Sequence, residues 1–586
     1  MNDDKVPLGF ASMVFVARLI SVDETWHIAQ SNGEATQLSR NLGLPSAISQ
    51  ILVQRGITEA GEAETFLNPR LGNLSDPLRL PDMDKAVERI LLAIKERQSV
   101  ALFGDYDVDG ISSVALLQKA LHAYEIDVSA YLPSRMAEGY GLTQMGLERC
   151  LAEAQPRLLI AIDCGTNSRE EVAWLKERGV DVIILDHHEP QGPPPCAVAR
   201  VNPKLGTEHT YLCSAGVVFK VVHALLRQAS VDCFRLKDHL DLVALGTVAD
   251  LAPMRGENRI LTRAGLACMP QSHSEGLRAL LHRSGVVGRL KSSDISFRLG
   301  PRLNAAGRLG AANDALALLM ANNATDANLL AERLEMQNRE RQDIEATTFA
   351  AAEILAEADI EIQSPAVVVG APDWHPGVVG IVASRLCRAF HRPAFVVAFD
   401  EEGMGRGSAR SLEHLCLVQA LDSCRDCLDK YGGHSQAAGF SVAADRFDEF
   451  KMKLLEIIAT LASSRSLTPR LQLDAEVTLA DLDREFIDVH DALGPFGMQN
   501  EQPLLLSRGV TPVFEPQRIK NKHWRIMLTQ GQGGIDSIFF NAPEKLPAPP
   551  WQVAFHLEIN EWKPHRPPQL YLKAIRAENE PIYRTS

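Results

Sequence analysis

In the first half of the chain, hydrophobic residues occur in two alternating patterns. Short apolar runs at 99–103, 158–162 and 182–185 have the length and composition of buried strands, and polar residues bound each of them. Between these runs, 112–124 and 169–178 carry apolar residues at the spacing of a helix. Repeated strand–helix–strand units form parallel sheets with helices on both faces, so the pattern predicts a doubly wound α/β domain.

The rest of the chain shows other patterns. The stretch from 328 to 360 is rich in Glu, Arg, Gln and Ala without Gly or Pro, which predicts one long helix. Strands and helices alternate again up to 462, and short apolar alternations interrupted by Pro and Gly follow, as is typical of a small β-barrel. We therefore expect an N-terminal extension packing on the first α/β domain (1–80), that domain (81–327), a connecting helix (328–360), a second α/β domain (361–462) and a barrel (463–586).

Composition narrows the class of protein. The chain has 586 residues, 46% hydrophobic and 23% charged, which indicates a folded globular protein. Its net charge of -14 argues against coating nucleic acid by bulk attraction, so any such contact must be local. The one C-x-x-C pair, Cys424 and Cys427, has no second pair beside it and favours a helix over a zinc site. No run of about 18 apolar residues occurs, so we expect no membrane span and a cytoplasmic protein with reduced thiols.

Three carboxylates follow the first predicted strand directly. They are Asp105, Asp107 and Asp109 in the segment Gly104–Gly110. Crowded carboxylates repel one another, and a divalent cation with oxygen ligands is the natural way to hold them ionised. The alternative is a capped helix N-terminus, for which one Asp would be enough.

Two more predicted strands end in the same way. Asp163 follows the second strand, and Asp186, His187 and His188 follow the third. Because ligands of an open α/β sheet collect at the carboxyl ends of its strands, these side chains should share one crevice. Asp250, after another apolar run, is a fourth candidate. Imidazole with carboxylates suits Mn²⁺ or a similar ion, and two ions about 4 Å apart would favour phosphate-ester hydrolysis.

These four segments, in this order, resemble the motifs of the DHH phosphoesterase superfamily. The resemblance implies two divalent cations, Mn²⁺ or Mg²⁺, and a residue, His188, that faces the scissile phosphate. Which two of the first three carboxylates bind most directly is open. The implied metal ligands are Asp105, Asp107, Asp109, Asp163, His187 and Asp250.

Further motifs resemble the RecJ branch of that superfamily. Gly300–Arg308 resembles a RecJ segment whose arginines meet substrate phosphate, and pieces near 408 and 433 resemble the DHH-associated domain, with Ala409 where Gly is usual. From residues alone, these segments could be ordinary turns. The resemblance implies catalytic roles for Arg302 and Arg308, and substrate contacts for Asn304, Ser408, Arg410 and His434. It also implies that Arg135 and Tyr140 hold the 5′ end of a strand.

The predicted barrel interleaves basic and aromatic residues, a composition that suits single-strand binding by charge and base stacking. The alternative is a basic edge strand protected from aggregation. The resemblance of this region to the OB-fold of the RecJ family favours the first interpretation. The candidate contacts are Lys520, Lys522, Trp524, Arg525, Trp562 and Arg566.

The resemblance as a whole implies an exonuclease that removes 5′-mononucleotides from single-stranded DNA in recombination and repair. It further implies a monomer, with single-strand-binding protein and a helicase as partners. Two alternatives stay open. One is a DHH phosphodiesterase of short oligonucleotides or cyclic dinucleotides, and the other is a non-enzymatic replication scaffold that binds single strands.

Overall fold

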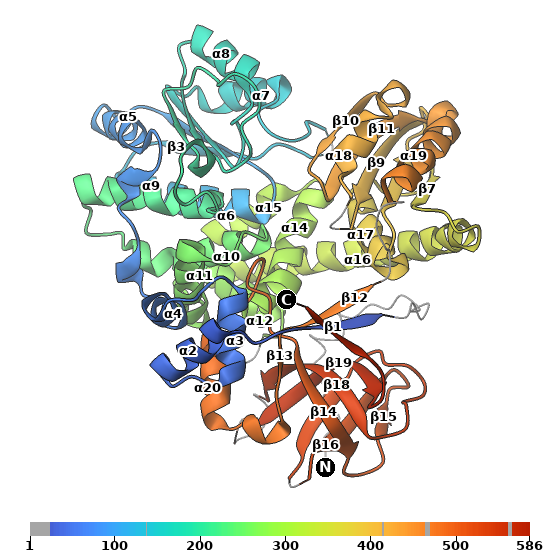
Figure 1. Ribbon diagram of the computed structural model, residues 1–586. Helices are drawn as coiled ribbons and strands as arrows, with labels where there is room; N and C mark the ends of the chain where they lie inside the picture. Colours follow the sequence, from blue (N-terminus) through green and yellow to red (C-terminus); the bar gives the residue numbers. More distant parts are fainter. Residues whose placement is uncertain are drawn as a thin grey trace. The chain divides into compact units, whose positions relative to one another are not determined.

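A computed structural model describes residues 24–135, 137–286, 288–412, 415–462, 469–531, 533–560, 565 and 567–585. Two compact units make up the described chain (Figure 1). The first contains Ala29–Gln337 and Leu473–Glu580, and the second contains Asn338–Gln472 with short segments from both ends of the chain. No described helix is both long enough and apolar enough to cross a membrane.

The first unit contains the predicted parallel sheet. Its strand order is β3-β2-β4-β5-β6, with every neighbouring pair parallel. The prediction of a doubly wound α/β domain is confirmed, although the sequence pattern missed the two short edge strands. The strands are β2 (Val100–Gly104), β3 (Val128–Tyr131), β4 (Leu158–Ile162), β5 (Asp181–Leu185) and β6 (Ala199–Val201).

Both faces of this sheet are covered, which explains why its strands are apolar throughout. Val100 and Leu102 belong to the core on one face, whereas Ala101 and Phe103 belong to the core on the other. The first face packs against α5 (Met83–Lys95), α6 (Val108–His122), α9 (Ser214–Gln228) and α10 (Leu240–Ala249); the second packs against α7 (Gln144–Ala154) and α8 (Arg169–Glu177).

The strand order places a topological switch point between β2 and β4. After β2 the chain crosses to β3 on one side, and it later returns to β4 on the other side of β2. The helices that follow these two strands therefore lead away in opposite directions and leave a crevice at the carboxyl ends of the strands. The first two acidic segments of the sequence analysis, at Asp105–Asp109 and at Asp163, follow these two strands.

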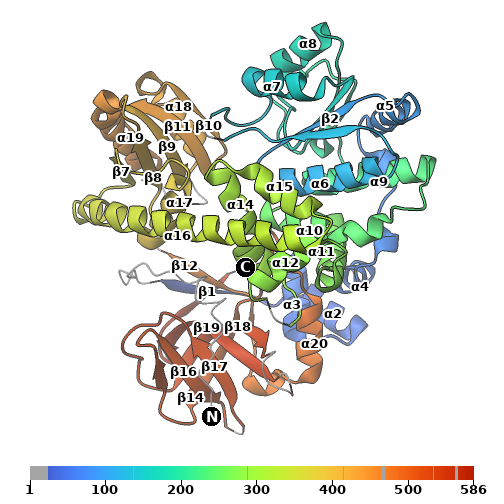
Figure 2. The same cartoon turned by 180° about the vertical axis from the view of Figure 1, so that it is seen from behind.

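Helices complete this domain and lead into the second unit. They are α11 (Gly256–Cys268), α12 (Glu275–Arg283), α13 (Ser292–Asp294), α14 (Gly300–Arg308) and α15 (Ala312–Met320). The long helix α16 (Ala324–Glu361) follows and is visible along its length in Figure 2. Its 38 residues span about 57 Å at about 1.5 Å per residue, and the helix starts four residues before the predicted one.

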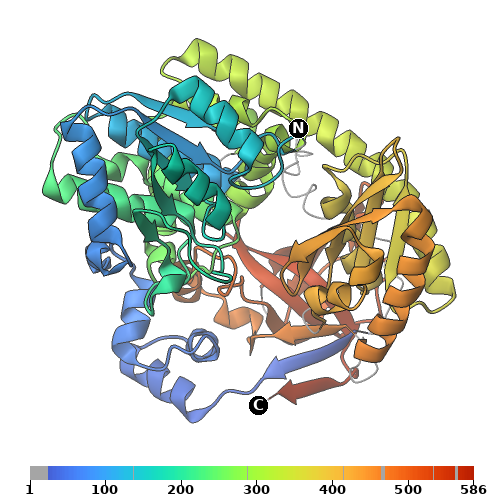
Figure 3. The same cartoon turned by 90° about the horizontal axis from the view of Figure 1, so that it is seen from above.

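The second unit contains a five-stranded mixed sheet with helices on both faces (Figure 3). The sheet order is β10-β11-β9-β8-β7, and α16 with α17 (Val379–Phe390) pack on one face. On the other face lie α18 (Leu417–Asp422), α19 (Phe447–Ala462), and the side chains of Cys424 and Cys427, which are buried in the apolar core. The strands are β7 (Val367–Ala371), β8 (Ala394–Phe399), β9 (Met404–Arg410), β10 (Lys430–Gly433) and β11 (Ala437–Ala443).

The C-terminal segment of the first unit forms the predicted OB-like barrel. Five strands pair in the order β14-β18-β19-β17-β16, and pairing of β16 with β14 closes the barrel. The helix α20 (Arg484–Ala492) lies between β13 and β14 in the sequence. A separate small sheet, in the order β12 (Arg470–Leu473), β1 (Thr25–Ala29) and β20 (Ile582–Thr585), belongs mostly to the second unit. The remaining strands are β13 (Ala475–Glu476), β14 (Leu505–Pro512), β15 (Gln517–Ile519), β16 (His523–Thr529), β17 (Ile535–Phe539), β18 (Trp551–Ile559) and β19 (Pro568–Ala577).

The N-terminal extension contacts two parts of the first unit. Apolar residues of α2 (Gly33–Leu42), α3 (Ser46–Gln54) and α4 (Ala60–Leu67) belong to the same core as the barrel, whereas residues from Leu71 on pack with the core of the α/β domain. The α/β domain also contacts α4, because Arg259 of α11 donates hydrogen bonds to the Phe66 carbonyl oxygen. The pattern of a short amphipathic helix shows that one face is buried but not which partner buries it.

Candidate metal centre

The first acidic segment is shaped by the turn from β2 into α6. Asp107 caps α6, its Oδ1 accepting a hydrogen bond from the Gly110 amide at 3.0 Å. Gly110 is required here, since an added Cβ would lie 2.5 Å from the Asp105 carbonyl oxygen. Asp105 is buried, and its Oδ1 has no hydrogen-bond partner among the described residues. Asp107 therefore caps the helix, and the buried carboxylate of Asp105 is available to bind a cation.

The third carboxylate, Asp109, lies at the N-terminus of α9. Its two oxygens accept hydrogen bonds from the Ser214 and Ala215 amides at 2.8 and 2.9 Å. The Ser214 hydroxyl donates to Asp163 Oδ1 at 2.8 Å. Burial and the charge of Asp107 raise the pKa of Asp109 to about 7, and the amide hydrogen bonds at the N-terminus of α9 offset only part of this rise. The start of α9 thus holds both acids in place.

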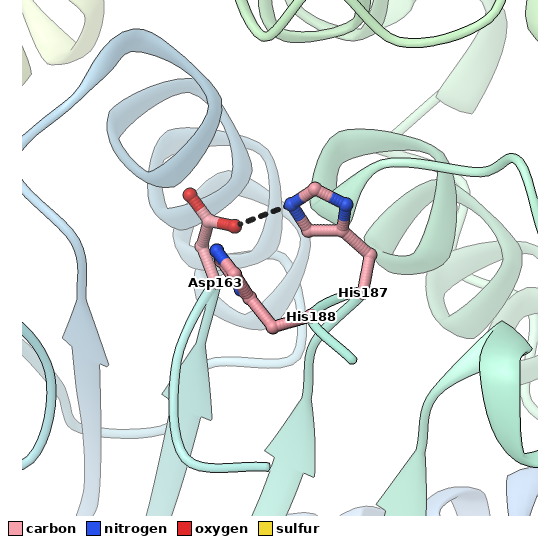
Figure 4. Close-up of side chains that lie close together, drawn as sticks. All are labelled: Asp163, His187 and His188. Atoms are coloured by element: carbon pink, nitrogen blue, oxygen red, sulfur yellow. Dashed lines mark ion pairs between the residues drawn. The ribbon is translucent and has the colours of Figure 1, made fainter. Parts of the chain in front are cut away.

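His187 lies among the carboxylates. Its Nε2 is 3.2 Å from Asp163 Oδ1, 3.7 Å from Asp250 Oδ2 and 4.0 Å from Asp109 Oδ2. Figure 4 shows the ion pair with Asp163 and the ring of His188 beside it. Asp250 follows the last residue of α10, so the fourth apolar run of the sequence forms a helix. Four segments far apart in sequence thus meet in one place.

The six predicted ligands can be divided into two groups of three: Asp105, Asp107 and Asp163, and Asp109, His187 and Asp250. Within each group the potential ligand atoms lie within 4.8 Å of one another, and the same is true of a third, overlapping group of Asp163, His187 and His188 (Figure 4). Carboxylate oxygen and imidazole nitrogen are the donors expected for Mn²⁺, and carboxylates also suit Mg²⁺. The residues present therefore fit two divalent cations.

Electrostatics favour the same conclusion. Burial raises the pKa of Asp163 well above its usual value, and repulsion from Asp109, Asp107, Asp105 and Asp250 raises it further. Burial and the charge of Asp107 also raise the pKa of Asp105. Burying several like charges together is costly unless cations compensate them.

Asp186 holds the two histidines in position and is not itself in either ligand group. Its Oδ1 accepts hydrogen bonds from the His187 amide at 2.7 Å and from His188 Nδ1 at 2.7 Å, and its Oδ2 accepts one from the Thr166 amide at 2.9 Å. Burial alone would raise the pKa of Asp186, but the hydrogen bonds from His188 and Thr166 outweigh it and lower the pKa. His188 is therefore oriented by a carboxylate that stays charged.

Tyr140 and Arg135 lie beside this centre. The Tyr140 hydroxyl donates to the Asp163 carbonyl oxygen at 3.1 Å and lies 3.1 Å from His188 Nε2. The Arg135 guanidinium carbon lies 5.4 Å from the centre of the Tyr106 ring. The structure thus brings both residues predicted to hold a 5′ end close to the acidic segments.

The predicted arginine-rich turn is the helix α14. Its Gly307 packs so closely on the acidic segment that an added Cβ would lie 2.7 Å from the Tyr106 carbonyl oxygen, and Arg308 is the next residue. Arg302 points elsewhere: its Nε donates to Glu335 at 2.6 Å. Asn304 is half-buried on the same helix.

In the second unit, Ser408 and Arg410 lie together on β9. Arg410 donates to the Ser408 hydroxyl at 3.1 Å, and a Cβ added to Gly380, near the start of α17, would lie 3.1 Å from that hydroxyl oxygen. His434 follows β10 and is exposed. Ser408 and Arg410 thus lie on the central strand of the second sheet, next to the N-terminus of α17, whereas His434 follows the edge strand β10.

Of the predicted DNA contacts on the barrel, some are exposed and others already contact neighbouring side chains. Lys520 and Lys522 are exposed in the turn between β15 and β16, but the Trp524 ring has the Arg518 guanidinium carbon 4.8 Å from its centre. Arg525 forms two 3.1 Å hydrogen bonds with Asp536. Both side chains are thus already engaged by neighbours. Trp562 and Arg566 lie outside the described residues.

Two residues that the sequence analysis did not predict form hydrogen bonds that help to position the metal centre. They are Ser214, which bonds Asp163, and Asn202, whose amide donates at 2.9 Å to both the Thr166 hydroxyl and the His188 carbonyl oxygen. Neither follows an acidic motif, so no local pattern marks them.

Family models match three parts of the chain: the DHH family N-terminal domain at 99–247, the DHHA1 domain at 363–460 and the RecJ OB domain at 473–574. A protein of Dickeya dadantii named single-stranded-DNA-specific exonuclease RecJ is 33% identical over 570 residues, which cover 91% of this chain and 96% of that protein. The chain belongs to the RecJ family. A Bacillus subtilis RecJ with the same name is 34% identical over 561 residues, covering 94% of this chain and 70% of the relative.

Solved RecJ structures show the same fold with metal bound. RecJ of Thermus thermophilus in complex with Mn²⁺ aligns with a TM-score of 0.82 at 31% identity, covering 95% of this chain and 80% of that one. The complex of the same protein with Mg²⁺ aligns with a TM-score of 0.77. Membership of the RecJ family, the OB-type barrel and a centre for Mn²⁺ or Mg²⁺ are therefore confirmed.

Proposed function

We propose that this RecJ-family chain is an exodeoxyribonuclease that degrades single-stranded DNA from the 5′ end and releases 5′-mononucleotides, in recombination and repair. The observation that carries the proposal is the pair of ligand groups at the sheet's switch point, each with three donors. Relatives of similar length are named single-stranded-DNA-specific exonucleases, which supports the choice of substrate.

The chemistry divides between the cations and the protein. Bound divalent ions would activate the attacking water and neutralise charge on the phosphate. His188, held by Asp186 on one ring nitrogen, keeps a fixed orientation beside the metal ligands, so it can face the scissile phosphate. Arg308, next to the residue that packs on the acidic segment, supplies positive charge for the same phosphate. Arg302 has a partner in Glu335 and would contact DNA only after exchanging it.

The enzyme would degrade DNA from the 5′ end because it holds that end of the DNA beside the metal centre. Arg135 and Tyr140 lie beside the metal centre and offer a cation and a hydroxyl-bearing ring to a terminal nucleotide. We assign further substrate contacts to Asn304, to the second unit, and to the barrel: Ser408, Arg410, His434, Lys520, Lys522, Trp524 and Arg525. The proposal also includes a cytoplasmic monomer that cooperates with single-strand-binding protein and a helicase, and the division into domains given above.

Labelled DNA tests substrate, polarity and metal dependence together. With Mn²⁺ or Mg²⁺, we expect rapid release of a 5′ label from single strands as mononucleotide, late release of a 3′ label, and little release from duplexes. A chelator should stop release, because both ligand groups need cations, and added Mn²⁺ should restore it. Early release of the 3′ label would refute the polarity, and undiminished release in chelator would refute the metal centre.

The barrel's contribution can be tested at its exposed turn. Lys520→Glu together with Lys522→Glu should weaken binding to long single strands by roughly 10-fold or more at low salt and reduce its salt dependence, because two phosphate contacts are lost. Hydrolysis of dinucleotides, which are too short to reach the barrel, should stay unchanged. The matched control is Lys237→Glu with Lys95→Glu. Equal effects on long and short substrates would favour an enzyme of short oligonucleotides.

A further inference from the structure

A cavity lies in the first unit, apart from the metal centre. Its volume is about 200 Å³, and it is enclosed by α11, the segment 289–293, α20 and β18. None of the six proposed metal ligands lines it. The cavity is larger than an engineered apolar cavity of about 150 Å³ that binds benzene, so a single ring with one or two substituents fits its size.

One wall of the cavity contains the ring of His490. The residue is 5% exposed. Burial lowers the pKa of His490 to about 4, so the ring is neutral at neutral pH. The ring therefore adds an uncharged surface to the lining of the cavity.

The remaining walls are mostly apolar. The ring of Phe496 lies beside the His490 ring, with 5.8 Å between centroids, and aliphatic side chains of Leu266, Leu290 and Leu557 complete the lining. Such a lining takes up an apolar ring, and a few polar groups fix its orientation.

The charged groups around the cavity leave one cation in excess. Arg289 is paired with Asp491, and Lys291 is paired with Glu558. Arg263 has no carboxylate partner among the described residues, and its three hydrogen bonds to backbone carbonyls are long, at 3.3–3.4 Å. Good N–H···O bonds measure about 2.7–3.2 Å, so a ligand carboxylate would give Arg263 a better acceptor.

We propose that this cavity is a binding site for a small aromatic carboxylate, with the ring against the apolar walls and the carboxylate toward Arg263. The site is formed by both the α/β domain and the barrel region, since Leu266 belongs to α11 and His490 to α20. It does not depend on the nuclease activity.

Calorimetric titration of the full chain with phenylacetate tests the site. We expect saturable 1:1 binding with a dissociation constant of roughly 1 mM or tighter, together with a rise in the unfolding temperature. Phenethylamine, with the same ring and the opposite charge, should bind at least about 10-fold more weakly. Equal binding of the two probes, or no binding of phenylacetate at 10-fold higher concentration (about 10 mM), would overturn the proposal.

Two variants locate the binding. Arg263→Gln should weaken phenylacetate binding at least about 10-fold, whereas Arg235→Gln, at a side chain that is 76% exposed outside the cavity, should leave it unchanged. Leu290→Trp fills part of the cavity with a larger side chain, so it should weaken phenylacetate binding at least about 10-fold. Unchanged binding in both cavity variants would place the probe elsewhere and refute the site.

Discussion

His187→Ala should reduce exonuclease activity at least about 1,000-fold, because a loss of about 4 kcal/mol of transition-state stabilisation corresponds to this factor. His187 is the only non-carboxylate donor in the two ligand groups, and its Nε2 lies within 4.0 Å of three carboxylates. Without it, one group retains two donors. The measurement is the rate of mononucleotide release from 5′-labelled single strands at saturating Mn²⁺.

Folding should not account for this loss. The His187 side chain is 17% exposed and belongs to no apolar core cluster, so its removal should leave the far-ultraviolet circular dichroism spectrum and the unfolding temperature near those of the parent. His273→Ala, at an exposed histidine of the same unit, is the matched control and should keep full activity. Full activity in purified His187→Ala would exclude the proposed centre.

Arg259→Ala should lower the free energy of unfolding of the first unit by about 4 kcal/mol, the largest stability effect that we expect. Arg259 is 2% exposed and donates hydrogen bonds at 2.7–3.1 Å to the carbonyl oxygens of Phe66, Ala492 and Leu493. Its guanidinium carbon also lies 3.8 Å from the centre of the Phe66 ring. Removal would leave several buried acceptors without a donor.

Urea unfolding monitored by circular dichroism would measure this effect. Because Arg259 joins α11 to the N-terminal helices and to the end of α20, the variant should also become sensitive to proteolysis between these segments. Arg235→Ala, at an exposed ion pair, should change stability by less than about 0.5 kcal/mol. A variant at Arg259 as stable as this control would show that other contacts hold the segments together.

The metal centre was predictable to a large extent because its ligands follow strands. Asp105, Asp163 and His187 each lie within two residues of the end of a buried strand, and strands of a parallel sheet end at one edge. An apolar run of about five residues is a local signal, and the direction of the sheet then brings the residues after each run together. The same reasoning does not reach Asp250, which follows a helix and whose position depends on how α10 packs.

The availability of the barrel's side chains for nucleic acid, in contrast to the metal centre, was not predictable from the local sequence. The composition of 518–525 indicated a basic, aromatic surface, yet Arg525 pairs with Asp536 of a neighbouring strand and Arg518 lies over Trp524. Local sequence shows which charges are present, but the pairing of β16 with β17 decides which of them are neutralised. Lys520 and Lys522 stay exposed because a turn projects them into solvent.

The sequence by itself determined the strand ends and their acidic and imidazole residues, the long helix and the barrel class, because each depends on short-range periodicity and residue type. Tertiary structure alone decided that Ser214 and Asn202 support the centre, that α2–α4 pack with the barrel core, and that Arg259 joins three segments. These contacts link residues distant in sequence, and their stability comes from burial and from hydrogen bonds that exist only once the chain has folded around them.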